Sequence, residues 1–413
     1  MSERPVLLLV GAGLLQVPAI EIAQQEGLRV VATDRDPQAA AFKFADETAV
    51  LDTKDVEGHI HIAQRLAAEG NLAAVFTEGA DVEVTVAEAA RSVGLPGVDP
   101  QAAHRCSNKA EFRRLCAAAG LPGPRFREVD SVADASAALR ETGLPAIVKA
   151  LDNSGSRGAT KIASEQDLSA AYDEALRWSG TDTVLVEECL SGPEQSVETL
   201  VGRDGRQWRC NIVDRPFAFD PYPIELGHDN PTVLSDRQQE QLYELVEVTT
   251  KVLGIDIGAA KADTMWTQRG PVVLEMTARL SGGFHSQYTS PLAHGTNDIK
   301  AALDLALGRE LDPADVTPRW RRYSVCRALF PQPGIISEIS GVDAALDLDG
   351  VEHVLFRMEV GERIRPYRTC ADRVGFVISC ADSREAAIAA ATEAASVISV
   401  ATEPEPAPAP AHA

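Results

Sequence analysis

The chain has 413 residues, and this length predicts two or three domains rather than one. Hydrophobic residues make up 45% and charged residues 24%, as in ordinary globular proteins, and no apolar run approaches the roughly 20 residues that a membrane helix needs. The formal net charge of −22 at pH 7 repels phosphate backbones, so the composition argues against nucleic acid or a membrane as the main partner.

Residues 5 to about 100 alternate between strand and helix patterns. The predicted strands are PVLLLV, LRVVATD and LAAVFTE, and the predicted helices are VPAIEIAQQEG, DVEGHIHIAQRLAAEG and VEVTVAEAARSVGLPG. This alternation predicts a parallel sheet with helices on both faces. We therefore expect an α/β domain over residues 1–105.

A short glycine motif follows the first strand. Gly11-Ala12-Gly13 begins a helical pattern, but the third glycine of a dinucleotide-binding turn is replaced by Gln16. Asp34 ends the second strand, where a dinucleotide fold places its ribose-binding carboxylate, yet TDRDP is also a good turn sequence. A dinucleotide-dependent oxidoreductase is therefore the least favoured interpretation.

A different pattern begins near residue 107. SNKAEFRRLCAAAGLP predicts a capped helix, LPAIVKALDNSGSRGATKIAS two strands around a glycine-rich loop, and DLSAAYDEALRW another helix. TVLVEECLSGPEQSVETLVG predicts two strands, DRQQEQLYELVEVTTKVLG a long helix, and GAAKADTMWTQRGPVVLEMTARLSGG a hairpin. Strands and the helix REAAIAAATEAASVI follow to about residue 398. The tail at 401–413, rich in proline and alanine, is predicted to be disordered.

Two strand ends in this region suggest a nucleotide site. Lys149 precedes a loop with Gly155 and Gly158, whose backbone can approach a phosphate closely, although a hairpin tip with a surface lysine fits the same pattern. Glu187 and Glu188 end an apolar strand, where a carboxylate and backbone groups can recognise an adenine amino group. On its own, a solvated acidic strand end is the more common case.

The predicted hairpin brings acidic residues together. Asp263 and Glu275 lie on its two strands and are expected to face each other across the pair. Two facing carboxylates favour a cation between them, and Mg²⁺ takes carboxylate oxygens together with phosphate oxygens. Arg279 follows four residues after Glu275, where a guanidinium would stabilise a transferring phosphoryl group.

The order of these features resembles the ATP-grasp superfamily over about residues 1–400. The resemblance implies a Rossmann-like parallel-sheet domain at 1–105, then an ATP-grasp domain at 106–305 of α+β character. A mobile lid over about 125–197 belongs to that domain, and a C-terminal α+β segment follows at 306–400. In such proteins the GxG loop of the first domain helps shape the carboxylate-substrate side rather than binding NAD.

The resemblance also implies ATP and one or two Mg²⁺ ions as cofactors. Lysines would contact the phosphates, the glycine-rich loop would close over them, and the acidic strand end would frame the adenine and bind the ribose. The implied ATP-binding residues are Lys109, Lys149, Ser154, Gly155, Ser156, Gly158, Glu187, Glu188, Leu190 and Glu194. Asp263 and Glu275 would hold Mg²⁺ with Thr277, which stands where the family commonly has asparagine and leaves the second ion open.

Three further stretches resemble the carboxylate–amine ligases that include dipeptide-forming L-amino-acid ligases: ELGHDNPTVLS, LEMTARLSGGFHSQYTSPLAHGTN and GERIRPYRTCADRVGFVIS. By this resemblance, Arg279 and Arg327 would be catalytic. His228, Ser281, Gly282 and Gly283 would bind a substrate, although a lone loop histidine is more often solvated and Ser281–Gly283 also suits a tight turn. The implied reaction activates a carboxylate as an acyl phosphate and joins it to an amine.

Two alternatives stay open at this point: a bicarbonate-activating carboxylase or carbamoyl-type enzyme, and a nucleotide-binding regulator without turnover. The seven cysteines are scattered and never spaced C-x-x-C, which favours reduced thiols. No signal peptide is apparent, so we expect a cytoplasmic protein. Its partners would be a small carboxylate and a small amine, and many relatives are homodimers.

Overall fold

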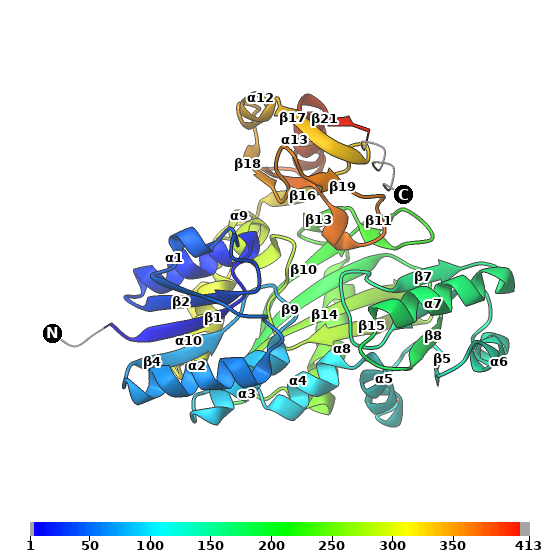
Figure 1. Cartoon of the computed structure of the whole chain (residues 1–413), viewed down its shortest axis with the longest axis horizontal. Coiled ribbons are helices and arrows are strands. Elements are labelled where there is room, and N and C mark those ends of the chain that lie inside the picture. The colour runs from blue at the N-terminus through cyan, green and yellow to red at the C-terminus, as the bar shows by residue number, and fades with distance from the viewer. Residues whose placement is uncertain (1–3, 405–413) are drawn as a thin grey trace, which may run out of the picture.

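The protein, seen here as a computed structural model that describes residues 4–404, begins with a four-stranded parallel sheet in the order β3-β2-β1-β4 (Figure 1). Its strands are β1 (Val6–Val10), β2 (Arg29–Asp34), β3 (Glu47–Val50) and β4 (Leu72–Phe76). Its helices are α1 (Val17–Gln25), α2 (Val56–Ala68) and α3 (Glu83–Ser92). Strand β1 is apolar throughout because Leu7 and Leu9 face one core, and Leu8 the other. The predicted parallel α/β unit is confirmed.

A second unit carries the glycine-rich loop. Its antiparallel sheet has the order β5-β8-β6-β7, formed by β5 (Phe126–Val129), β6 (Ala146–Ala150), β7 (Ala159–Ile162) and β8 (Val184–Glu188). Helices α6 (Val132–Thr142) and α7 (Leu168–Trp178) share its core. This unit corresponds to the predicted lid, whose mobility stays a prediction. It ends sooner than expected, because residues from 194 onward join the central sheet.

The central sheet has eight strands in the order β15-β14-β9-β10-β13-β16-β20-β18. They are β9 (Glu194–Val201), β10 (Gln207–Arg215), β13 (Gly227–Asn230), β14 (Gly258–Thr267), β15 (Gly270–Thr277), β16 (Tyr323–Leu329), β18 (Val351–Phe356) and β20 (Gly375–Ala381). Helices α4 (Pro100–Ser107), α5 (Lys109–Ala118) and α8 (Asp236–Leu253) pack in one core with it. The C-terminal segment therefore extends this sheet.

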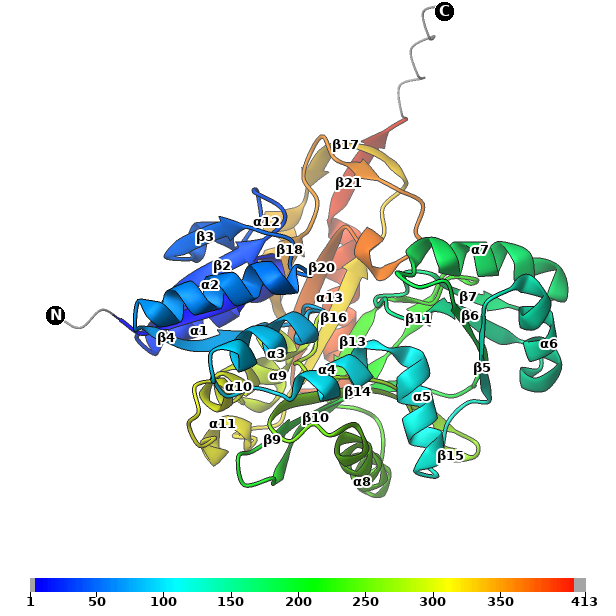
Figure 2. The same cartoon turned by 60° about the horizontal axis from the view of Figure 1, so that its bottom comes forward.

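The remaining elements include two small sheets, β19-β17-β21 and β11-β12, and several helices (Figure 2). They are β11 (Phe217–Ala218), β12 (Ile224–Glu225), α9 (Ser290–His294), α10 (Asp298–Ala306), α11 (Pro313–Val316), β17 (Gly334–Ser340), α12 (Val342–Leu346), β19 (Arg363–Ile364), α13 (Arg384–Val397) and β21 (Ser399–Glu403). Strand β21 pairs with β17, so the tail predicted to be disordered from 401 is ordered to 403, because its alternating residues extend the β17–β21 ladder. Residues 405–413 lie outside the described part.

The seven cysteines are unpaired and six of them are buried. No helix within residues 4–404 is long and apolar enough to cross a membrane.

Candidate active site

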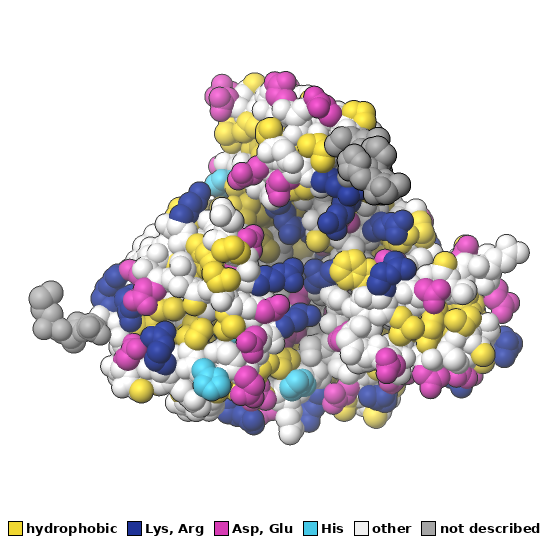
Figure 3. Space-filling model, viewed as in Figure 1, with side chains coloured by type: hydrophobic (Ala, Val, Ile, Leu, Met, Phe, Trp, Pro, Cys, Tyr) yellow, Lys and Arg dark blue, Asp and Glu magenta, His cyan; other side chains and the backbone are white. Residues whose placement is uncertain are grey.

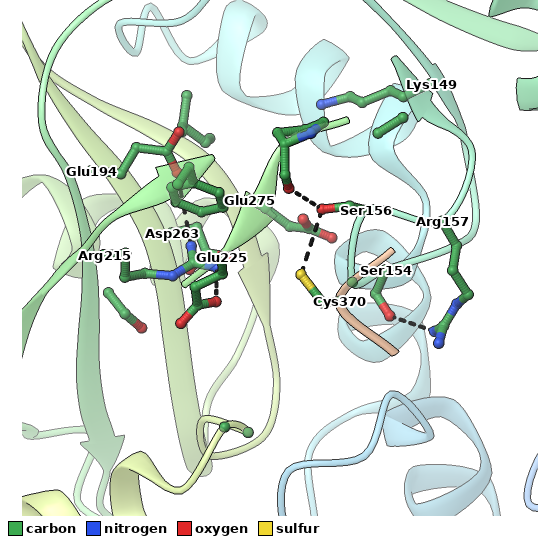
Figure 4. A pocket seen from close by; sticks show the side chains of 18 of the residues that line it. Lys149, Ser154, Ser156, Arg157, Glu194, Arg215, Glu225, Asp263, Glu275 and Cys370 are labelled. Atoms are coloured by element: carbon green, nitrogen blue, oxygen red, sulfur yellow. Dashed lines mark hydrogen bonds and ion pairs between the residues drawn. The ribbon is translucent and has the colours of Figure 1, made fainter. Parts of the chain in front are cut away.

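The parts of the chain meet around a cavity of about 770 Å³. Residues of the N-terminal domain, the glycine-rich loop, the central sheet and the C-terminal segment line it, and Figure 4 shows side chains of the last three around it. The predicted residues that line it are Lys109, Lys149, Ser154, Gly155, Ser156, Glu187, Glu188, Leu190, Glu194, His228, Asp263, Glu275, Thr277, Arg279, Ser281, Gly282 and Gly283. Gly158 and Arg327 do not line it.

The glycine-rich loop between β6 and β7 has left-handed backbone at Gly155, Ser156 and Gly158, with φ of 59°, 63° and 70°. The Ser154 hydroxyl donates to Asp81 of the N-terminal domain. On the other side, the Cys370 N–H donates to the Gly155 carbonyl at 2.9 Å. The loop is therefore held between the first domain and the C-terminal segment.

Gly158 acts at the base of this loop rather than in the cavity. A Cβ at Gly158 would lie 2.8 Å from Cβ of Trp178 on α7. Its place among the phosphate-binding residues is corrected: it permits the turn and the close approach of α7.

The two predicted lysines are each paired with a carboxylate. Nζ of Lys109 lies 2.7 Å from Oε1 of Glu275, and Nζ of Lys149 lies 2.6 Å from Oε2 of Glu187. Nε of Arg113 on α5 lies 2.5 Å from Oε1 of Glu187. Burial opposes ionisation of Glu187, but Arg113 and Lys149 hold its pKa at about 2. Its carboxylate is committed to two cations, so its contact with adenine stays a prediction.

The other acidic residues predicted for the nucleotide differ in their surroundings. Glu188 lies 3.3 Å from Nε of Arg125 and 3.2 Å from a terminal nitrogen of Arg269. Burial raises the pKa of Glu194 to about 7, and the nearby carboxylates of Asp263 and Glu225 add to this effect. Glu194 is therefore partly protonated near neutral pH, a form that can donate a hydrogen bond.

Asp263 and Glu275 are directly opposite each other in the β14–β15 register, as predicted. Asp263 accepts from Lys261 at 2.5 Å and lies 2.6 Å from Arg215. The described residues contain no cluster of three or more His, Cys, Asp or Glu side chains that could hold a metal alone. Among residues 4–404, the buried hydroxyl of Thr277 has no hydrogen-bond partner. Two carboxylates and a free hydroxyl fit a Mg²⁺ that shares its remaining positions with phosphate oxygens and water.

Arg279 is held by a residue that the sequence did not reveal. Its side chain is 9% exposed, one terminal nitrogen pairs with Asp81, and the other donates to the Leu280 carbonyl at 2.7 Å. Nε of Arg279 has no partner within the described chain. Asp81 also lies 3.7 Å from Arg157 of the glycine-rich loop. This aspartate thus joins the first domain, the loop and the predicted catalytic arginine.

The predicted substrate residues need two corrections. The Ser281 N–H donates to Oε1 of buried Glu198 at 2.5 Å, so it does not point at a substrate. Nε2 of His228 lies 2.7 Å from the Thr289 hydroxyl, and burial together with the neighbouring His285 holds the pKa of His228 well below its usual value. His228 is neutral at pH 7, not a cation for a carboxylate.

Arg327 is also placed differently from the prediction. It lies on β16, where its guanidinium is 2.5 Å from Asp229 and donates to the Cys326 carbonyl at 3.0 Å. The β13–β16 register pairs Arg327 with Gly227, which leaves Asp229 as a diagonal neighbour. This ion pair keeps Arg327 out of the cavity.

Besides Arg279, three arginines reach the cavity from downstream of the lid and were not predicted: Arg215, Arg357 and Arg373. Arg215 ends β10 and lies 2.7 Å from Glu225, three residues before His228. The sequence signal for Glu225 was its place in the same loop as His228. Arg357 and Arg373 carried no local signal, because each stands at a strand end whose neighbours only the fold supplies.

Two protein-family models match this arrangement. Residues 142–287 match the ATP-grasp domain model, and residues 327–403 match the model of L-amino acid ligase C-terminal domain 2. The chain contains an ATP-grasp domain. The ATP-grasp match spans the glycine-rich loop, β8, the β14–β15 hairpin and Arg279, so the resemblance expected from the sequence is confirmed.

Comparisons over longer stretches agree. An uncharacterized protein, y4rH, of Sinorhizobium fredii is 29% identical over 375 residues, covering 89% of this chain and 77% of that protein. A D-alanine–D-alanine ligase of Azoarcus is 28% identical over 280 residues, covering 67% and 83%. Among solved structures, the L-amino acid ligase from Bacillus licheniformis superimposes with a TM-score of 0.83 at 22% identity, covering 97% and 100% of the chains. Phosphoribosylglycinamide synthetase from Anaerococcus prevotii does so with a TM-score of 0.75 at 19% identity and the same coverage. These two structures share the fold of this chain.

Proposed function

We propose that the protein is an ATP-dependent carboxylate–amine ligase, which activates an amino acid or a related small acid as an acyl phosphate and joins it to an amine. The observation that carries this proposal is one cavity that combines Lys109, Lys149 and the glycine-rich loop with the facing pair Asp263–Glu275 and buried Arg279. The match of the C-terminal segment to an L-amino acid ligase domain supports an amine as the acceptor.

The proposed reaction has two steps. A carboxylate oxygen attacks the γ-phosphorus of ATP, and the bond from that phosphorus to the bridging oxygen breaks and releases ADP. Lys109 and Lys149 balance phosphate charge, and Arg279 stabilises charge on the transferring group. A Mg²⁺ at Asp263 and Glu275 would supply further charge neutralisation when bound. The amine nitrogen then attacks the acyl carbon, the carbon–oxygen bond to phosphate breaks, and the nitrogen releases a proton, which leaves an amide.

The decisive experiment measures ADP formation with ATP, Mg²⁺ and a panel of amino acids and amines, singly and in pairs, with bicarbonate as a separate arm. We expect turnover that needs both a carboxylate and an amine. Turnover with bicarbonate alone would overturn the proposal in favour of a bicarbonate-activating enzyme. ATP binding without turnover in any arm would instead indicate a nucleotide-binding regulator.

Two variants keep this result tied to the site. Glu275→Gln is expected to lower turnover by on the order of 100-fold, since it removes charge from the facing pair. Glu244→Gln, at an exposed position on α8, is the matched control and should leave turnover unchanged. Similar rates for the two variants would contradict the assignment of the site.

A further inference from the structure

Most cations that line the cavity are matched by carboxylates of the chain itself. Besides the lysine pairs and the Arg279–Asp81 pair, Arg215 lies 2.6 Å from Asp263 and Lys161 lies 3.0 Å from Asp220. Such pairing is expected, because a charge withdrawn from water needs a counter-charge. A cation without one in this cavity is therefore informative.

Arg373 is such a cation, and Arg357 lies beside it at an exposed position of the same cavity. Both line the cavity, and neither has a carboxylate oxygen within ion-pair distance among residues 4–404. Arg373 is 8% exposed, and its guanidinium donates only to carbonyls, at 2.8 Å to Cys370 and 3.4 Å to Glu225. Its guanidinium also lies 5.0 Å from the ring centre of Phe376. These contacts hold Arg373 in place, and Glu225, the carboxylate that attracts it, is already paired with Arg215 at 2.7 Å.

The strand register explains why the two arginines meet. Phe356 of β18 pairs with Gly375 of β20, and the Arg357 N–H donates to the Val374 carbonyl at 2.9 Å. The two side chains thus leave neighbouring strand ends of one sheet. Withdrawal from water, followed by the positive charges of Arg373 and others nearby, lowers the pKa of Arg357. Both side chains line the same cavity, where an anion would offset their two like charges.

The acidic residues near the two arginines have other partners. Asp372 accepts from the backbone N–H groups of Arg368 and Thr369 at 3.0 and 2.8 Å, and Glu225 is bound to Arg215. In a chain with a net charge of −22, two unneutralised guanidinium groups in a cavity are an unusual local excess of positive charge. Figure 3 shows Lys and Arg side chains gathered around the hollow below the C-terminal segment.

We propose that Arg357 and Arg373 form a subsite for a side-chain carboxylate, so that one of the two substrates is a dicarboxylic amino acid. This inference rests on the proposed function, since it names the substrate class for the same cavity. Guanidinium groups bind carboxylates through two parallel hydrogen bonds, and the unused N–H groups of both arginines are suited to this. Lys109, Lys149 and the glycine-rich loop are left for the phosphates of ATP.

The kinetic test compares acids with amides of the same size: L-aspartate with L-asparagine, and L-glutamate with L-glutamine, each with the partner found in the panel. We expect kcat/KM for the acid to exceed that for its amide by about tenfold or more. Arg357→Gln should abolish this preference and leave the KM for ATP within about twofold. An equal rate for acid and amide in the wild type, or a preference unchanged in Arg357→Gln, would overturn the subsite. A raised KM for ATP would assign the arginines to the nucleotide and overturn it too.

Two further variants serve as a control and as a second test of the subsite. Arg365→Gln removes one exposed charge from the same segment outside the cavity and should keep the preference. Arg373→Gln should act as Arg357→Gln does, but Arg373 is buried, so its thermal midpoint is measured first. Arg357 is exposed at the cavity, so Arg357→Gln alone tests the subsite if Arg373→Gln does not fold.

N-acetyl-L-aspartate and N-acetyl-L-asparagine, which lack a free amine, show whether the acid belongs to the carboxylate or the amine substrate.

A binding measurement separates this inference from the proposed function. Calorimetric titration of the ATP-grasp protein with L-aspartate and with L-asparagine, in the presence of MgADP, needs no turnover. If no pair of substrates yields ADP, the ligase proposal fails, whereas aspartate binding that is lost in Arg357→Gln still supports the subsite. Binding of aspartate no tighter than that of asparagine, or unaffected by the substitution, would overturn it.

Discussion

Single residues decide the charge of the cavity, and Glu187 is the clearest case. It lies between Lys149 and Arg113, so two cations and one anion share a buried space. Such a group contributes little net stability, because desolvation offsets the attraction, but removal of one member leaves an uncompensated charge. Its value is positional: Lys149 is held at the mouth of the glycine-rich loop before any phosphate arrives.

Asp81 has the same positional role for Arg279, and Asp81→Asn tests it. The substitution removes the carboxylate that orients the guanidinium while it keeps the side-chain size. We expect kcat for ADP formation to fall by about tenfold or more, since a misplaced guanidinium stabilises the transferring group poorly. The thermal midpoint should fall as well, because Arg279 is 9% exposed and loses its counter-charge, so kcat is compared at a temperature at which both proteins stay folded. Asp256→Asn, at an exposed position, is the control; an unchanged kcat in Asp81→Asn would contradict the role.

Among the elements, the glycine-rich loop depends most on its backbone. Its left-handed residues are strained for most side chains, and its consecutive residues Ser154 and Gly155 are tied to different parts of the chain. Gly155 and Gly158 have similar φ values but different surroundings. An added Cβ at Gly155 would lie 3.7 Å from Cys370, which is ordinary contact, whereas the Gly158 Cβ would meet Trp178 at 2.8 Å.

This difference predicts unequal effects of Gly158→Ala and Gly155→Ala. Both pay the cost of a left-handed alanine, about 1 kcal/mol. Only Gly158→Ala also forces α7 away from the base of the loop. We expect its KM for ATP to rise several-fold more than that of Gly155→Ala, measured by ADP formation. Equal effects would mean that the backbone conformation alone controls the loop.

At the scale of the whole molecule, stability depends on a carboxyl group at the junction of the first domain and the cavity. Glu83, at the start of α3, is 4% exposed, and one of its oxygens has no hydrogen-bond partner within the described residues. Burial raises its pKa from 4.5 to about 7, although Arg279 opposes the shift. Between these values the folded protein keeps a proton that the unfolded chain has released. Stability from this group is therefore present below pH 4.5 and is lost as pH rises to about 7.

Glu83→Gln should remove that dependence. The full shift corresponds to on the order of 3 kcal/mol, an upper limit for this group. We expect the variant and the wild type to have similar thermal midpoints at about pH 5, and the variant to be the more stable above pH 7. Glu57→Gln, exposed on α2, should follow the wild type at every pH. A constant difference between Glu83→Gln and the wild type would contradict the assigned titration.

The sequence predicted much of the fold because its patterns are local. Strand β1, the β14–β15 hairpin and α8 were predicted from periodicity and turn residues within single stretches. Strand β3 was missed because ETAV is short and mostly exposed, so it has no apolar run. The start of the tail was misplaced because β21 is stabilised by β17, far away along the chain, as the pairing of Glu403 with Ile335 shows.

The candidate site divides in the same way. The sequence by itself determined the glycine-rich loop, the facing pair Asp263–Glu275 and the presence of Arg279. Turn glycines and the two strands of a hairpin can be recognised within one short stretch of sequence. Only the tertiary structure decided that Asp81 pairs with Arg279 and that Asp229 pairs with Arg327. It also decided that Arg357 and Arg373 line the same cavity. Each of these depends on a partner from a distant part of the chain. Such partners set the net charge around a buried side chain, and they cannot be identified from the spacing of residues along the sequence.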